Sequence, residues 1–370
     1  MGFDPTPLGF NEPTLTTVTF VSYLLAFICY AVHLLAKSSG VAHVARGRMA
    51  LAGAGAGGTS DVVFSGGASQ GRSGVYAPVL GRLASGLTLL AWVSLTSALI
   101  LRWVEGGHAP YVTLYEIATM LVWGMTTIYL VLFEGILRTR AAGAFVVLLV
   151  FSLQTYAILF IPSDLKKVIQ LVPALRSYWL MIHVSFAIMA YSAFGTAAGA
   201  GLTLIAKHYT NGRIASALPS EPAIEEFMFR AVAVGFPLQT LLLITGAIWA
   251  QEAWTKAWSW DPKEVWALVT WLSYAAYLHV RVQRGVRGVT MAWLSLIGFV
   301  VVLITFLGVN YLVQWFGGQS MHTYSTDNGT PNTMGVAGLA VVLFFASLLG
   351  LALFSWLRIR FPTRRPRATK

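Results

Sequence analysis

Seven histidines are the residues of this chain best suited to binding a transition metal, at positions 33, 43, 108, 183, 208, 279 and 322. A neutral imidazole is the usual axial ligand of haem iron where no thiolate is available. The single cysteine, Cys29, lies in an apolar stretch. A single cysteine excludes disulfide frameworks, cysteine-based zinc sites, iron–sulfur clusters and CxxC relays. Any cofactor must therefore be held by other residue types.

Tryptophans crowd one segment, GAIWAQEAWTKAWSWDPKEVW at 246–266. An interfacial aromatic belt explains one or two of them at each helix end. Four indoles, Trp249, Trp254, Trp258 and Trp260, would equally suit an apolar platform on which a planar ligand such as a porphyrin stacks. Composition leaves both interpretations open.

Two groups of polar residues have the spacing of helix starts. Asp261 is followed by Pro262 and by Glu264 at the third helical position, which predicts an N-cap and a capping box. Thr113 and Glu116 have the same spacing, and a structural role is favoured there over catalysis.

The elements that position these residues are membrane spans. Of 370 residues, 56% are hydrophobic and 11% charged, with a mean hydropathy of +0.69, so we predict an all-α integral membrane protein. Apolar runs near the length of a spanning helix occur at 15–36, 83–103, 114–134, 141–161, 179–206, 231–250, 263–281, 291–312 and 335–357. They predict about nine transmembrane helices.

The basic residues predict the orientation. Eighteen of the 25 fall on one side of this arrangement and six on the other, which places the N-terminus outside and the C-terminus inside. The net charge of +11 is therefore assigned to orientation and lipid contact, with no nucleic acid as partner. We divide the chain into a tail with the first span (1–36), a cytoplasmic Gly-rich linker (37–82), a core (83–357) containing the tryptophan loop at 246–264, and a basic cytoplasmic tail (358–370).

This orientation sorts the histidines by depth. His183 and His322 share the outer side with the tryptophan loop, where two imidazoles above and below a porphyrin would make a six-coordinate site. His279 lies 18 residues beyond Asp261, about 27 Å along a helix and close to the inner surface. His33 has a similar depth but no supporting neighbour, and His43, His108 and His208 are assigned to solvent.

The tryptophan segment closely resembles the "WWD" signature of haem-handling membrane proteins, in particular the CcsA type (also called CcsB) of System II cytochrome c biogenesis. The runs GHAPYVTLYE, RSYWLMIHVSFAIMAY, WLSYAAYLHVR and QSMHTYS are similar to other recurrent family segments and keep their order, over about residues 105 to 325. The chain departs from the family pattern at Thr255, where Gly is frequent, and at Ala257, where an aromatic residue is frequent.

The resemblance implies that His183 and His322 are paired external haem ligands and that His279 is an intramembrane ligand. It implies haem b as cofactor, a ResB-type membrane partner, and attachment of haem vinyls to the CxxCH thiols of apocytochrome c, a haem lyase activity. The expected location is the cell membrane with the haem site facing outward, favoured over a plastid thylakoid membrane. The alternative is an exporter of haem or another small aromatic solute, without covalent attachment.

Overall fold

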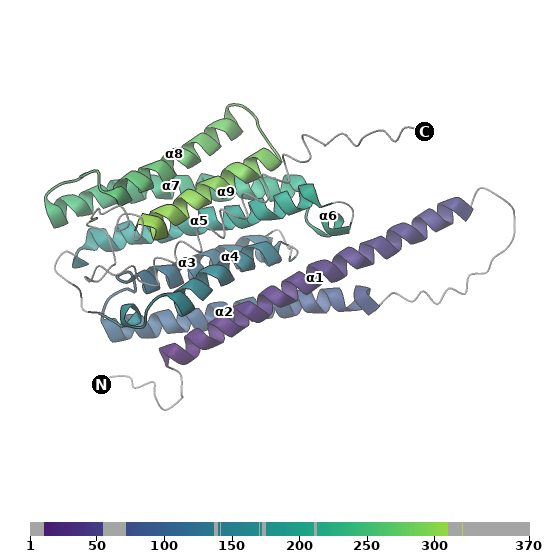
Figure 1. Ribbon diagram of the computed structural model, residues 1–370, viewed down its shortest axis with the longest axis horizontal. Helices are drawn as coiled ribbons and strands as arrows, with labels where there is room; N and C mark the ends of the chain where they lie inside the picture. Colours follow the sequence, from purple (N-terminus) through teal and green to yellow (C-terminus); the bar gives the residue numbers. More distant parts are fainter. Residues whose placement is uncertain are drawn as a thin grey trace, which may run out of the picture.

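The computed structural model describes residues 11–54, 72–136, 140, 142–169, 171, 175–210, 213–309 and 320. Within these ranges the regular elements are all helices, as the sequence predicts (Figure 1). The elements are α1 (Glu12–Ala54), α2 (Arg72–Gly106), α3 (Leu114–Ile128), η2 (Tyr129–Ile136), α4 (Gly143–Thr155), η3 (Tyr156–Phe160), η4 (Asp164–Lys166), α5 (Tyr178–Tyr209), α6 (Arg213–Ala217), α7 (Glu221–Trp254), α8 (Pro262–Val282), α9 (Val289–Leu303) and η6 (Ile304–Gly308).

Seven helical segments of the described chain are long and apolar enough to cross a membrane. They are Glu12–Ser38, Ala77–Gly106, Leu114–Leu132, Gly143–Phe160, Tyr178–Tyr209, Glu221–Trp254 and Val289–Gly308, and each coincides with a predicted span. The predicted span at 263–281 forms α8, which is not among the seven. The predicted span at 335–357 lies outside the described residues. The count of nine and the orientation therefore stay predictions, as does the division into domains.

Helix α5 lies between the other helices of the bundle. It packs against α3 and α4 on one side and against α7 and α9 on the other (Figure 1). Its middle section, Ser192–Gly201, is buried throughout, and small side chains there let neighbouring helices approach closely, a common device in membrane bundles. A Cβ added at Gly199 would lie 2.8 Å from a side-chain carbon of Val146. This packing holds α3, α5 and α7, which carry the site described below.

Candidate functional site

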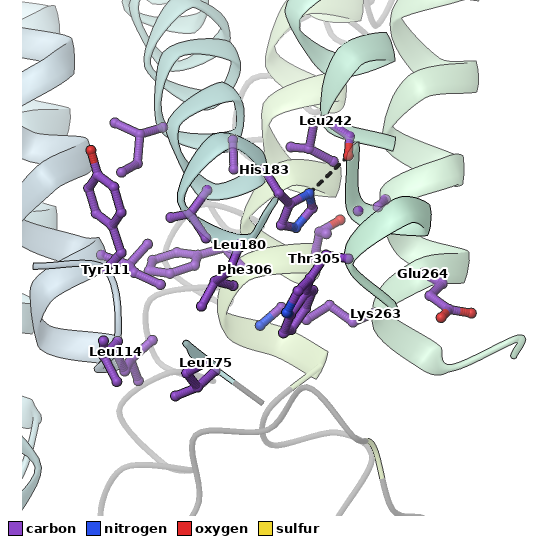
Figure 2. A pocket seen from close by; sticks show the side chains of 18 of the residues that line it. Tyr111, Leu114, Leu175, Leu180, His183, Leu242, Lys263, Glu264, Thr305 and Phe306 are labelled. Atoms are coloured by element: carbon purple, nitrogen blue, oxygen red, sulfur yellow. Dashed lines mark hydrogen bonds between the residues drawn. The ribbon is translucent and has the colours of Figure 1, made fainter. Parts of the chain in front are cut away.

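A cavity of about 670 Å³ opens at one end of the bundle between α3, α5, α7, α8 and η6. Its walls are mainly aliphatic and aromatic (Figure 2). Cavities of this size and character are typical binding sites for medium-sized organic ligands. Residues that line it include Tyr111, Thr113, Leu114, Lys167, Leu175, His183, Gly246, Trp249, Trp254, Trp258, Lys263, Glu264, Thr305 and Phe306.

His183, near the start of α5, is half-buried and lines this cavity. Its Nδ1 atom lies 2.9 Å from the carbonyl oxygen of Leu242 in α7 (Figure 2). A carbonyl oxygen only accepts, so Nδ1–H is the donor, and in a neutral imidazole Nε2 is then the acceptor nitrogen. A backbone carbonyl on the other ring nitrogen is the usual support of a metal-binding histidine.

The ring of His183 is held on two further sides. It stacks on Trp249, with ring centroids 6.0 Å apart and an angle of 21° between the planes. Gly246 supplies the space on α7, because a Cβ there would lie 2.7 Å from Cε1 of the imidazole. The contacts with Leu242, Gly246 and Trp249 fix both the position and the tilt of the ring.

The tryptophans of the loop do not form one flat surface. Trp249 and Trp254 meet edge to face, with centroids 4.8 Å apart at 62°, and Trp258 and Trp260 meet at 5.8 Å and 90°. The first three line the cavity, whereas Trp260 does not and is 71% exposed. The indoles therefore build a corner with edges and faces, not the flat platform that was one of the two interpretations left open by composition.

The loop between α7 and α8 begins and ends in fixed backbone geometry. Thr255 ends α7 with a positive φ of 57°, a conformation that glycine adopts without strain and a β-branched residue does not. Asp261 and Glu264 form the predicted capping box at the start of α8, which the structure confirms.

Asp261 also receives a contact from a distant part of the chain. It is buried, accepts a hydrogen bond from the backbone N–H of Lys263, and accepts another from the hydroxyl of Ser320 at 2.8 Å. Asp261 thus joins the start of α8 to the chain at residue 320.

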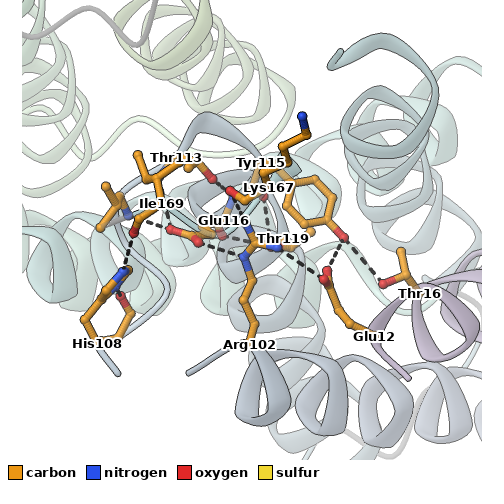
Figure 3. A network of polar contacts seen from close by, with 12 residues as sticks. Glu12, Thr16, Arg102, His108, Thr113, Tyr115, Glu116, Thr119, Lys167 and Ile169 are labelled. Atoms are coloured by element: carbon orange, nitrogen blue, oxygen red, sulfur yellow. Dashed lines mark hydrogen bonds and ion pairs between the residues drawn. The ribbon is translucent and has the colours of Figure 1, made fainter. Parts of the chain in front are cut away.

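The opposite wall of the cavity is fastened by a buried ion-pair network (Figure 3). Arg102 at the end of α2 binds Glu116 at 2.7 Å and Glu12 at 3.2 Å, and donates to the carbonyl oxygen of Lys167. Glu116 accepts hydrogen bonds from the backbone N–H groups of residues 112 and 113, which confirms the predicted capping box of α3. The network thus holds two of the wall segments, 111–114 and 165–169, against each other.

Among the described side chains, His183 is the histidine that lines the cavity. His322 lies outside the described residues. His279 is exposed in the last turn of α8, and His33 is buried between α1 and α2, with Nδ1 2.6 Å from the carbonyl oxygen of Ala77. His108, which the sequence assigns to solvent, instead lies with Nε2 2.9 Å from the carbonyl oxygen of Ile169. The hydrogen bond is itself exposed and His108 is half-buried, so the ring borders solvent while it contacts the segment at 165–169.

Several site residues were not singled out from the sequence. Tyr111, Lys263, Thr305 and Phe306 line the cavity, and Gly246 makes room for the imidazole. Lys263 could have been singled out from the sequence, because it is a basic residue directly beside the tryptophan-rich loop. The other four become part of the site only through contacts distant in sequence.

Fold and cavity together define a multi-span helical membrane protein with a large, mainly apolar binding site. A family model described as "Cytochrome C assembly protein" matches residues 111–316. Two similar curated proteins are named "Cytochrome c biogenesis protein CcsA", from Porphyra purpurea (34% identity, 66% of this chain and 88% of the relative) and Guillardia theta (38%, 65% and 84%). A third, from Prochlorococcus marinus, is 38% identical over 64% of this chain and 82% of its own.

A solved structure shares the fold. It is named "Cytochrome c Heme Lyase CcmF" and superposes with a TM-score of 0.57 at 15% sequence identity, over 97% of this chain. The present chain spans about half (53%) of that protein's length.

The chain belongs to the cytochrome c assembly protein family. The resemblance to CcsA proteins drawn from the sequence is confirmed, and the chain is a membrane protein of cytochrome c biogenesis.

Proposed function

We propose that this chain presents haem b at the outer face of the membrane and joins its vinyl groups to the CxxCH thiols of apocytochrome c, together with a ResB-type membrane partner. The observation that carries the proposal is the setting of His183. Its Nδ1–H is engaged by Leu242 and its ring lines a large apolar cavity beside Trp249.

The cavity suits haem as a substrate in size and chemistry. Its volume of about 670 Å³ lies within the range for organic ligands of this size. Aliphatic side chains and the faces and edges of Trp249, Trp254 and Trp258 favour a flat apolar ring system. The lone pair of Nε2 on His183 provides an iron ligand.

The second axial ligand that we propose is His322. Its own position is outside the described residues, but Ser320, two residues earlier, is hydrogen-bonded to Asp261 at the start of α8. Two residues of chain reach at most about 7 Å. This anchor supports a ligand pair of His183 and His322 with the tryptophan loop beside it.

The reaction needs no cofactor besides its two substrates. A cysteine sulfur forms a bond to the α-carbon of a vinyl group, and the thiol proton ends on the β-carbon. Each thiol thus adds across one C=C bond, so no atom is lost and no net oxidation occurs. The protein contributes position: it fixes the macrocycle while the CxxCH segment approaches, an effect that makes an intermolecular step behave like an intramolecular one.

His279 belongs to the proposal as a ligand of a second, inner haem site. It is exposed at the end of α8, a helix of 21 residues whose other end borders the cavity. Because the imidazole of His279 is exposed, there is space beside it for a haem whose iron is also bound by a residue of a membrane partner. We therefore assign the remaining inner ligation to the ResB-type protein.

Coexpression of the full chain, its ResB-type partner and an apocytochrome c tests the proposed activity. We expect haem-stained cytochrome that survives denaturation and acid–acetone extraction, and none when this chain is omitted. Secreted haem that is fully extractable from the cytochrome fraction would contradict the lyase and favour the exporter.

A further inference from the structure

The buried face of α8 is polar. Thr270, Tyr274, Tyr277 and Arg281 are buried, and their spacing of three and four residues places them on one side of the helix. The opposite side is exposed and includes Leu272, at 52%. Helix α8 lies at the edge of the bundle beside α7 and α9 (Figure 1). Polar side chains thus face the interior of the bundle along about 16 Å of this helix.

Three hydroxyls on this side of α8 are buried and have no hydrogen-bond partner among the described residues. They belong to Tyr274 and Tyr277 of α8 and to Ser295 of α9. Tyr274 lies against α9, because a Cβ at Gly298 would be 2.8 Å from its Cζ, and Ser295 is on the same side of α9, three residues before Gly298. Nearly all buried polar atoms in proteins have a partner, and an internal water molecule commonly supplies it.

This region, which we call the α8 seam, begins at the cavity. Thr305 lines the cavity, and its hydroxyl lies 2.9 Å from the hydroxyl of Thr270. Thr270 is in turn one helical turn before Tyr274 on the same face. The cavity and the threonine pair therefore provide a polar entry path for water into the seam.

The far end of the α8 seam is closed by a buried ion pair. Arg281 of α8 binds Glu225 of α7, and neither side chain is more than 10% exposed. The guanidinium also lies 5.5 Å from the ring centroid of Phe229. An arginine does not give up its proton in a protein, and a fixed positive charge excludes protons from water-filled pores. Arg281 therefore has the chemistry of a proton barrier.

We propose that the α8 seam binds a row of internal water molecules that extends the cavity along α8 and ends at the Arg281–Glu225 pair. Polar groups inside a membrane bundle characteristically line water-filled cavities or proton paths. A hydrated arm of this length crosses about half of an apolar bilayer core, which is about 30 Å thick. The ion pair keeps this arm closed to protons. The water row does not depend on which ligand the cavity binds.

Hydroxyl-radical footprinting of the purified full chain tests for the water, because a short X-ray pulse generates radicals from bound water as well as from solvent. Tyr274 and Tyr277 should be oxidised several-fold faster than Tyr23. Tyr23 is the matched control, since it is equally buried but its hydroxyl lies 2.8 Å from that of Thr126. Equally slow oxidation of the three tyrosines would overturn the proposal.

Proton flux into lipid vesicles that contain the full chain tests the barrier. Vesicles with wild-type protein should be as proton-tight as lipid alone. The double variant Glu225→Gln/Arg281→Met removes the pair without leaving a lone buried charge, and it should raise proton flux several-fold without releasing a trapped dye. Adding Tyr274→Phe and Tyr277→Phe, which keep the rings but remove the hydroxyls, should abolish the increase.

The matched control is Glu226→Gln/Arg230→Met, which removes an exposed ion pair of α7 and should leave proton flux unchanged. Three results would overturn the barrier: no increase in Glu225→Gln/Arg281→Met, an increase accompanied by dye release, or an increase that persists when the tyrosine hydroxyls are removed.

Discussion

His183 and His33 have closely similar local surroundings but differ in what lies beyond the ring. In both, Nδ1 donates to a backbone carbonyl of a neighbouring helix, Leu242 for His183 and Ala77 for His33. In both, the ring lies against a glycine of that helix, Gly246 or Gly81. The same supporting hydrogen bond thus occurs at two distant points of the bundle.

The difference is the space next to each imidazole. His183 lines the large cavity and stacks on Trp249. His33 does not line that cavity and is only 8% exposed. A backbone carbonyl that fixes the tautomer of a histidine is therefore not enough to make that histidine a haem ligand. The adjoining cavity distinguishes a proposed haem ligand from a histidine that joins two helices.

The largest effect that we expect comes from removing each imidazole. His183→Gly should reduce covalently attached haem in the coexpression assay at least tenfold, with partial recovery on adding imidazole, a free ligand that can occupy the vacated position. His33→Gly should retain attachment per folded molecule. Its cost is stability, since it loses a buried hydrogen bond and leaves a void, seen as a lower melting temperature of the purified protein.

Imidazole provides the internal control for this pair, because it restores a ligand but cannot restore helix packing. If imidazole restores haem attachment in His183→Gly but not in His33→Gly, the result supports a ligand role for His183 and a packing role for His33. Imidazole-dependent recovery in His33→Gly, or full activity of His183→Gly without imidazole, would invalidate it.

A smaller effect is expected from a methyl group beneath each ring. A Cβ at Gly246 would lie 2.7 Å from Cε1 of His183, whereas a Cβ at Gly81 would lie 3.1 Å from Cε1 of His33. Gly246→Ala should therefore tilt the ligand ring and lower haem affinity several-fold. Gly81→Ala should leave haem affinity unchanged, because His33 does not line the cavity. Its effect on stability should be small, since the crowding of the His33 ring is partly offset by the gain in helix propensity, about 1 kcal/mol.

Haem titration of both variants checks this prediction. Equal affinities of Gly246→Ala and Gly81→Ala would show that the position of the His183 ring does not control binding.

The parts of the fold that follow from local sequence were predictable. The capping boxes at Thr113 and Asp261 depend on residues three positions apart, and both are confirmed. The seven candidate spans follow from apolar runs of sufficient length.

The parts that depend on distant contacts were not predictable. His183 meets Leu242 across 59 positions and Glu12 meets Arg102 across 90, and no spacing rule connects such pairs. Composition also could not show that the indoles meet at steep angles, because ring orientation is decided by packing. The ligand role of His322 stays a prediction from sequence.

The most direct test of the central claim is the absorption spectrum of the purified full chain with its partner, in wild type, His183→Gly and His322→Gly. We predict a low-spin, six-coordinate haem signal in the wild type. In each single variant this outer-site signal should be lost or converted to high spin, and imidazole should restore it. An unchanged low-spin spectrum in both variants would contradict the claim that these two imidazoles hold the haem beside the tryptophan loop.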